Sequence, residues 1–295
     1  MSPIDSISLI INSYHEDIYE SSIGISTRHL LITKLVERLQ SLGYTVHIND
    51  LEPADALEEK TPERRLEVVG NVARAVASAI ESKSFPIVLS DSDFASVGVA
   101  AGLSSHEEDF DVIWFGADFH SPDEHASGTF EGTGLSMIVG EGSEALRQSV
   151  PGWRPVPLGR MTFCGMRGLS NEQQVELERV SARVVGVGEK ETESIARRLG
   201  DALDDMAGSH CHVHIDLNCL GDSVDEVDGL AAPRCLSKDD LLECLEVTSR
   251  ERMPIALTVI HSNSAREETD KEVNAAVSAI SRLMLLLKHE EWQSG

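Results

Sequence analysis

Side chains that suit metal or acid–base chemistry gather directly after four apolar segments of the sequence. They lie in residues 89–93, 114–120, 212–218 and 259–263. Carboxylate oxygens neutralise a divalent cation, and a neutral imidazole adds a directional nitrogen ligand. A cation held there lowers the pKa of a water molecule and so supports hydrolysis. Taken together, the four segments favour a divalent-metal site.

Asp118 and His120 form the most informative pair in these segments. Residues two apart on an extended chain point to the same side, so both side chains can reach one ion. The same spacing of two residues separates His212, His214 and Asp216. The two histidines are therefore either partners of the acidic cluster or hydrogen-bonded core residues. Each segment alone also fits the turns and helix caps that Asp, Ser and Asn favour, whereas the four together favour the metal site.

The elements that must position these side chains follow from the alternation of Ile- and Val-rich runs with longer amphipathic stretches. We predict strands at residues 8–11, 44–48, 86–89, 111–115, 161–164, 183–187, 212–217 and 255–260. We predict helices at residues 28–42, 63–82, 171–181, 191–206, 237–250 and 268–288. Such alternation gives a three-layer α/β/α fold with a central, mainly parallel sheet of about eight strands. Chemistry in these sheets lies at the carboxyl ends of strands, so the polar segments should meet at one edge.

The composition limits the partners that the protein can have. With 25 Lys+Arg against 50 Asp+Glu in 295 residues, the formal net charge is −25. Approach to nucleic-acid phosphates or to an anionic membrane would be repulsive, so we expect neither as a partner. The charge permits a small cationic substrate or a divalent metal, and it equally fits a solvated acidic surface.

We expect a cytoplasmic protein with one domain. No run approaches the ~18 apolar residues that span a bilayer, and residues 1–5 lack the basic and apolar parts of a signal peptide. Five cysteines, an odd number without a Cys-x-x-Cys pair, indicate reduced thiols. The absence of a linker or an internal repeat predicts a single domain over residues 1–295.

The order, spacing and flanks of the polar segments resemble those of the arginase/agmatinase (ureohydrolase) family. Residues 88–98 stand where that family has a strand and Gly-Gly-Asp-His-Ser, and residues 114–120 stand on its Asp-Ala-His-x-Asp segment. Further matches are residues 127–132 to its Ser-Gly-Asn-x-His-Gly loop, 165–167 to its Gly-x-Arg strand end, 215–218 to its Asp-x-Asp segment and 262–263 to its late Glu-x-Asn. The resemblance runs from about residue 8 to residue 288 and implies an arginase/deacetylase-like fold and a homo-oligomer.

The family holds two manganese ions with six side chains, and by the resemblance this sequence keeps only Asp216 of them unchanged. The position of the family's bridging Asp is Gly116, which offers no ligand. We therefore expect one divalent ion rather than a bridged pair. The remaining metal positions are Asp93, Asp118, His120, Asp216 and Asn218. Asp118, His120 and Asp216 resemble the zinc triad of the histone deacetylases, so the resemblance implies manganese or zinc.

Three further family positions concern the substrate and proton transfer. Glu131 replaces the loop His and His261 replaces the late Glu that pairs with the guanidinium, so we assign both a catalytic role in moving protons. Ser127 matches a position that contacts the amino-acid end of the substrate. The resemblance thus implies a metal-dependent hydrolase of a guanidino or amide C–N bond other than a peptide bond. Two alternatives stay open: an arginase-like pseudoenzyme without the manganese pair, with a binding or regulatory role, and a binding module for an unrelated ligand.

Overall fold

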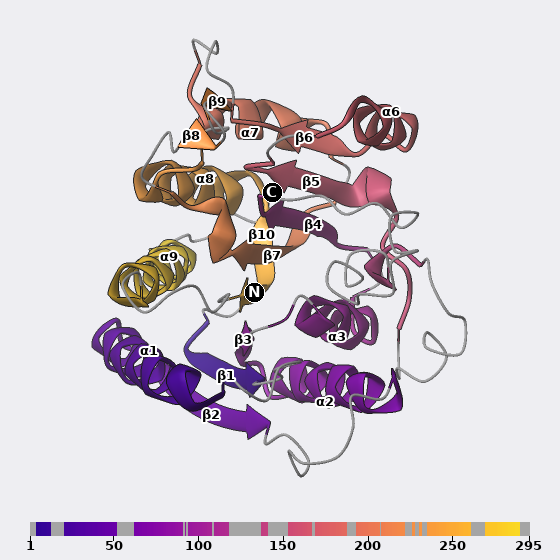
Figure 1. Ribbon diagram of the computed structural model, residues 1–295. Helices are drawn as coiled ribbons and strands as arrows, with labels where there is room; N and C mark the ends of the chain where they lie inside the picture. Colours follow the sequence, from indigo (N-terminus) through magenta and orange to yellow (C-terminus); the bar gives the residue numbers. More distant parts are fainter. Residues whose placement is uncertain are drawn as a thin grey trace.

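The computed structural model describes residues 4–12, 21–51, 62–90, 92, 94–107, 109–117, 137–140, 153–166, 169–187, 193–206, 208–221, 226–227, 230–231, 235–260 and 269–289. A sheet runs through the middle of the molecule, and helices cover both of its faces (Figure 1). The predicted α/β fold class is confirmed.

The central sheet has eight strands in the order β2-β1-β3-β10-β7-β4-β5-β6, and every neighbouring pair is parallel. Its strands are β1 (Ser6–Asn12), β2 (Thr45–Leu51), β3 (Phe85–Ser90), β4 (Asp111–Phe115), β5 (Met161–Cys164), β6 (Arg183–Val185), β7 (His210–Asp216) and β10 (Met253–Ile260). A separate antiparallel pair is formed by β8 (Glu226–Val227) and β9 (Leu230–Ala231). Because the strands of the sheet are parallel, their carboxyl ends lie at one edge.

Two groups of helices cover the sheet (Figure 1). One face carries α1 (Ser21–Ser41), α7 (Ile195–Asp204), α8 (Lys238–Glu251) and α9 (Thr269–His289). The other face carries α2 (Pro62–Glu81) and α3 (Phe94–Ser104), while α6 (Asn171–Arg179) lies against β6. Short 3₁₀ turns precede β5 and follow β7, namely η2 (Leu158–Arg160) and η3 (Leu217–Cys219). Among the described helices, none combines the length and the apolar character that a membrane-spanning segment needs.

The observed bounds agree with the sequence pattern for most elements. β4 and β5 begin and end at the predicted residues, because both are short apolar runs with polar flanks. α1 begins at Ser21 rather than at residue 28, and α7 covers Ile195–Asp204 rather than residues 191–206. The strand predicted at residues 183–187 is two residues too long, since β6 ends at Val185.

Helix α3 is absent from the sequence prediction, and its burial explains why. All eleven of its residues are buried, so it has no polar face and no helical periodicity for a sequence pattern to reveal. Glycines bring it close to α2: a Cβ added at Gly98 would lie 2.7 Å from the carbonyl oxygen of Val69, and one at Gly102 would lie 2.6 Å from that of Ala73. The two helices therefore pack backbone against backbone.

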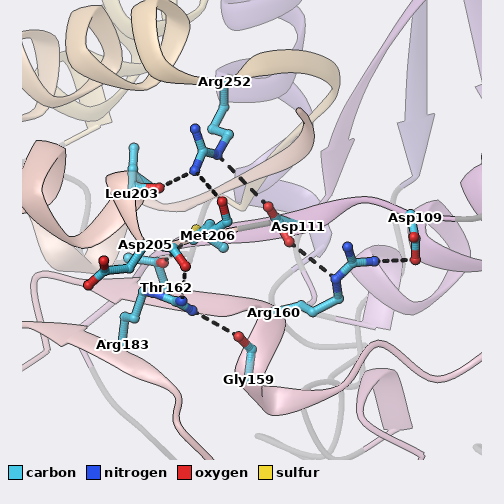
Figure 2. Close-up of polar contacts among 10 residues, drawn as sticks. All are labelled: Asp109, Asp111, Gly159, Arg160, Thr162, Arg183, Leu203, Asp205, Met206 and Arg252. Carbon is cyan, nitrogen blue, oxygen red and sulfur yellow. Dashed lines mark hydrogen bonds and ion pairs between the residues drawn. The ribbon is translucent and has the colours of Figure 1, made fainter. Parts of the chain in front are cut away.

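An ionic cluster closes the amino edge of the sheet. Asp111, the first residue of β4, lies between two guanidinium groups, with Oδ1 3.4 Å from Nε of Arg160 and Oδ2 3.9 Å from Nε of Arg252 (Figure 2). Arg252 also donates to the carbonyl oxygens of Leu203 and Met206, at the end of α7. Burial raises the pKa of Asp111, and the nearby charges of Arg160 and Arg252 offset part of this effect. The cluster joins the start of β4 to η2, to the residue that ends α8 and to the carboxyl end of α7.

We expect Asp111→Asn to lower the free energy of unfolding by about 3 kcal/mol, because it leaves buried arginine charge without its carboxylate. Asp109→Asn is the matched control, since Asp109 contacts the same Arg160 but its side chain is 77% exposed. We expect the control substitution to lower the free energy of unfolding by less than about 1 kcal/mol. Urea denaturation of both variants measures the difference, and equal losses would show that the cluster contributes no more than a surface ion pair.

Candidate functional site

Four neighbouring strands bring the polar segments of the sequence to one edge. β3, β10, β7 and β4 are consecutive in the sheet, and each is followed by one of the four segments singled out by the sequence. Their carboxyl ends are level: Ile260 pairs with Ser90 and with Asp216, and Phe115 pairs with Ile215. The predicted convergence of these strand ends is therefore present in the fold.

Asp216 and Asn218 place two oxygen-bearing side chains at this edge. Oδ1 of Asp216 accepts a hydrogen bond from the backbone N–H of Asn218 at 3.0 Å and so caps η3. Oδ1 of Asn218 accepts from the backbone N–H of Ala117 at 3.3 Å. Both side chains are half-buried. The two hydrogen bonds orient the side chains and join the end of β7 to the end of β4.

The other predicted site residues lie outside the described part of the chain. These are the metal positions Asp93, Asp118 and His120, the catalytic residues Glu131 and His261, and the substrate position Ser127. Their roles, like those of Asp216 and Asn218, stay predictions. Within the described ranges, no group of three or more His, Cys, Asp or Glu side chains is placed to hold a metal ion.

Gly116 decides which metal arrangement the described residues fit. The residue has no side chain, and a Cβ added there would lie 2.7 Å from Nε1 of Trp114. A carboxylate at this position therefore does not fit, and neither does a metal pair that needs it as a bridge. The oxygens of Asp216 and Asn218 are of the kind that one hard divalent cation prefers, namely carboxylate and amide oxygens.

Two histidines of β7 lie in the core beside the site. Nε2 of His212 is 2.8 Å from Oγ1 of Thr258, and Nδ1 of His214 is 2.6 Å from Oγ of Ser96. Both rings are fully buried. Burial lowers the pKa of His212 to about 3, and it lowers the pKa of His214 well below its usual range with a smaller effect of His212. Both imidazoles are therefore neutral, and each has a hydrogen-bond partner in the core.

Trp114 and Ser96 contribute to this region without having been predicted from the sequence. The indole of Trp114 stacks on the imidazole of His214, with ring centroids 3.4 Å apart and an interplanar angle of 14°. Strand alternation could have placed Trp114 on the same face of the sheet as His214, but not in contact with it. Ser96 belongs to α3, which has no recognisable sequence pattern, so no signal pointed to it.

The cysteines are free, as the sequence predicts, and all five belong to the described residues. Cys219, beside Asn218, is fully buried like Cys164 and Cys244. The pKa of the Cys164 thiol is raised by its hydrogen bond with Cys244 and by burial. The Cys164 thiol is therefore uncharged and a poor nucleophile. Cys164, Cys219 and Cys244 pack as small hydrophobic residues.

Comparison with known proteins identifies the family. The model of the Arginase family matches residues 28–286. An arginase from Bacillus subtilis is 28% identical over 210 residues, covering 68% of this chain and 70% of the relative, and one from Bacillus caldovelox is 22% identical over 263 residues, covering 84% and 88%. The crystal structure of the Bacillus subtilis arginase superposes with a TM-score of 0.76 at 22% identity, covering 95% of this chain and 98% of that one.

The fold and the edge on which the site lies define an α/β protein of the arginase type. A more distant structure, an agmatine ureohydrolase of Thermoplasma volcanium, shares the fold with a TM-score of 0.63 at 13% identity, covering 97% of this chain and 90% of that one. The chain belongs to the Arginase family. Enzymes of this family depend on a divalent metal, manganese, act on small guanidino substrates and are commonly oligomers. Membership supports a ureohydrolase-like hydrolase of a guanidino C–N bond.

The lowered pKa of His212 predicts a loss of stability in acid. Below pH 6.5, the ordinary pKa of histidine, His212 is protonated in the unfolded chain. In the folded chain it stays neutral until the pH falls to about 3. Stability contributed by neutral His212 is therefore complete above pH 6.5 and decreases by about 1.4 kcal/mol per pH unit below it.

We measure how far the free energy of unfolding falls between pH 7.5 and pH 5, by urea denaturation. We expect this fall to be about 2 kcal/mol smaller in His212→Gln than in the wild type. Glutamine can keep a bond to Thr258, which limits the cost of the substitution itself. His47→Gln, at an exposed position of β2, is the control and should behave as the wild type. The same pH dependence in all three proteins would contradict the assignment.

Proposed function

We propose that the protein is a metal-dependent hydrolase of a guanidino or amide C–N bond, with a remodelled site that holds one divalent cation. The observation that carries this proposal is the pair Asp216 and Asn218, whose oxygens are oriented at the carboxyl edge between β7 and β4 by hydrogen bonds at 3.0 and 3.3 Å. Carboxylate and amide oxygens are the ligands that hard divalent cations prefer, and the negative charge of the Asp216 carboxylate suits such an ion.

In this proposal Asp118, His120 and Asp216 hold the ion, manganese or zinc, and Asp93 and Asn218 assist. When bound, the ion supplies charge neutralisation and makes water more acidic. Glu131 or His261 moves the proton that hydrolysis transfers, and Ser127 contacts the far end of the substrate. These residues follow strands that end at one edge of the sheet, which supports their acting together.

The net charge of −25 supports a cationic guanidino compound as the small-molecule substrate, because the negative field favours its approach. We further propose one domain over residues 1–295, a cytoplasmic location and a homo-oligomer. We propose no nucleic-acid or membrane partner, since the same field repels both.

A second candidate is an arginase-like pseudoenzyme that binds or regulates and needs no metal. Gly116 favours it, because the family's bridging carboxylate has no counterpart at this position and no room for one. The two candidates differ in whether Asp216 matters for turnover and in whether the chain retains an ion.

We expect urea to be released from arginine or agmatine by the manganese- or zinc-loaded protein, and Asp216→Ala to lower kcat/KM at least about 100-fold, because loss of an outer partner alone costs 10- to 100-fold in metal sites. Asp201→Ala, an exposed carboxylate of α7, is the matched control and should keep full activity. Urea release that is absent from the wild type, or equal in the two variants, would favour the pseudoenzyme.

We also expect about one ion per chain after equilibrium dialysis against manganese or zinc and elemental analysis. Asp216→Ala should retain much less, while Asp201→Ala should match the wild type. Fewer than about 0.1 ion per wild-type chain would rule out the hydrolase.

A further inference from the structure

The space beside Gly116 is occupied by an aromatic ring. A Cβ added to this glycine would lie 2.7 Å from Nε1 and 3.0 Å from Cδ1 of Trp114. Real Cβ atoms essentially never come closer than 3.0 Å to a heavy atom outside their own residue and its chain neighbours, so any side chain at position 116 requires the indole to move. Gly116 is not among the described glycines with positive φ. The obstacle is therefore the indole and not the backbone conformation.

The indole is fixed by its stacking partner. Trp114 is 6% exposed, and its ring lies parallel to that of His214 at a centroid distance of 3.4 Å. The two residues are direct cross-strand partners of β4 and β7, so the sheet register itself holds the rings together. Moving the indole away from Gly116 would break this stack.

The stack is in turn held from the helical layer. Nδ1 of the fully buried His214 is 2.6 Å from Oγ of Ser96 on α3. Helix α3 cannot withdraw easily, because at Gly98 it already packs against the backbone of α2. A continuous set of contacts thus runs from α2 through α3 and His214 to the indole that covers Gly116.

We infer that Trp114 determines the number of ions at this site: its indole fills the space of the family's bridging ligand and restricts the site to a single cation. The statement about the cation rests on the proposed function, whereas the steric part rests on the contacts alone. Without a carboxylate between them, two adjacent cations lack the negative charge that holds them together.

A double-mutant cycle on the metal-free protein tests the steric part. We expect Gly116→Ala to lower the melting temperature by about 5 °C or more in the wild-type background and by much less in a Trp114→Val background, where the space is open. Trp114→Leu replaces Trp114→Val if the latter does not fold. Gly70→Ala is the control, because its Cβ would meet nothing closer than Nη1 of Arg74 at 3.5 Å. Additive effects of the two substitutions would overturn the inference.

Manganese counting by equilibrium dialysis tests the consequence. We expect at most one ion per chain in the wild type and in Gly116→Asp, and a second ion only when Gly116→Asp is combined with Trp114→Val. Two ions in the wild type or in Gly116→Asp alone, or no second ion in the double variant, would overturn the role of Trp114 in limiting the ion number.

The two proposals fail in different ways. If the wild type binds no ion but the stability cycle is non-additive, the proposed function is wrong and the steric role of Trp114 stands. If the cycle is additive, the steric role is wrong whether or not the wild type binds an ion.

Discussion

The parallel alignment of every strand in the central sheet is the constraint on which the remaining structure depends. Parallel strands require a crossover between them, which places helices on both faces and buries the interior strands. The same alignment separates the two edges. The amino edge is closed by Asp111 and its arginines, which secure the end of α7, whereas four polar segments follow the strands at the carboxyl edge. Structure and chemistry are thus assigned to opposite ends of the same strands.

Near the carboxyl edge, the sheet and α3 are joined by a packed core contact. Trp114, His214 and Ser96 form a stack and a hydrogen bond between the sheet and α3, and both histidines of β7 are neutral because burial lowers their pKa values. The oxygens of Asp216 and Asn218 lie at the end of β7 and in η3, and one hydrogen bond links Asn218 to Ala117 after β4.

Much of the fold was predictable from the sequence, and less of the site. Buried parallel strands read as apolar runs, so β4 and β5 were predicted at their observed bounds, and strand order along the chain indicated that Asp216 and Asn218 would lie at a sheet edge. Helix α3 left no such pattern because it is buried on all sides. Ser96 therefore could not be predicted as a partner of His214, and the backbone contact of Gly98 with α2 depends on two helices whose packing no local pattern encodes.

The sequence by itself determined the fold class, the parallel sheet and the absence of a side chain at Gly116, because each follows from local periodicity or from the identity of one residue. Only the tertiary structure decided what fills the vacant position. A glycine leaves room for water, for a ligand or for a neighbouring side chain, and the choice depends on which groups the sheet register and the helical layer bring near it. Here Trp114 pairs with His214, which lies a hundred residues further along the chain, and this pairing holds the indole. The indole lies 2.7 Å from the position of a Cβ at Gly116.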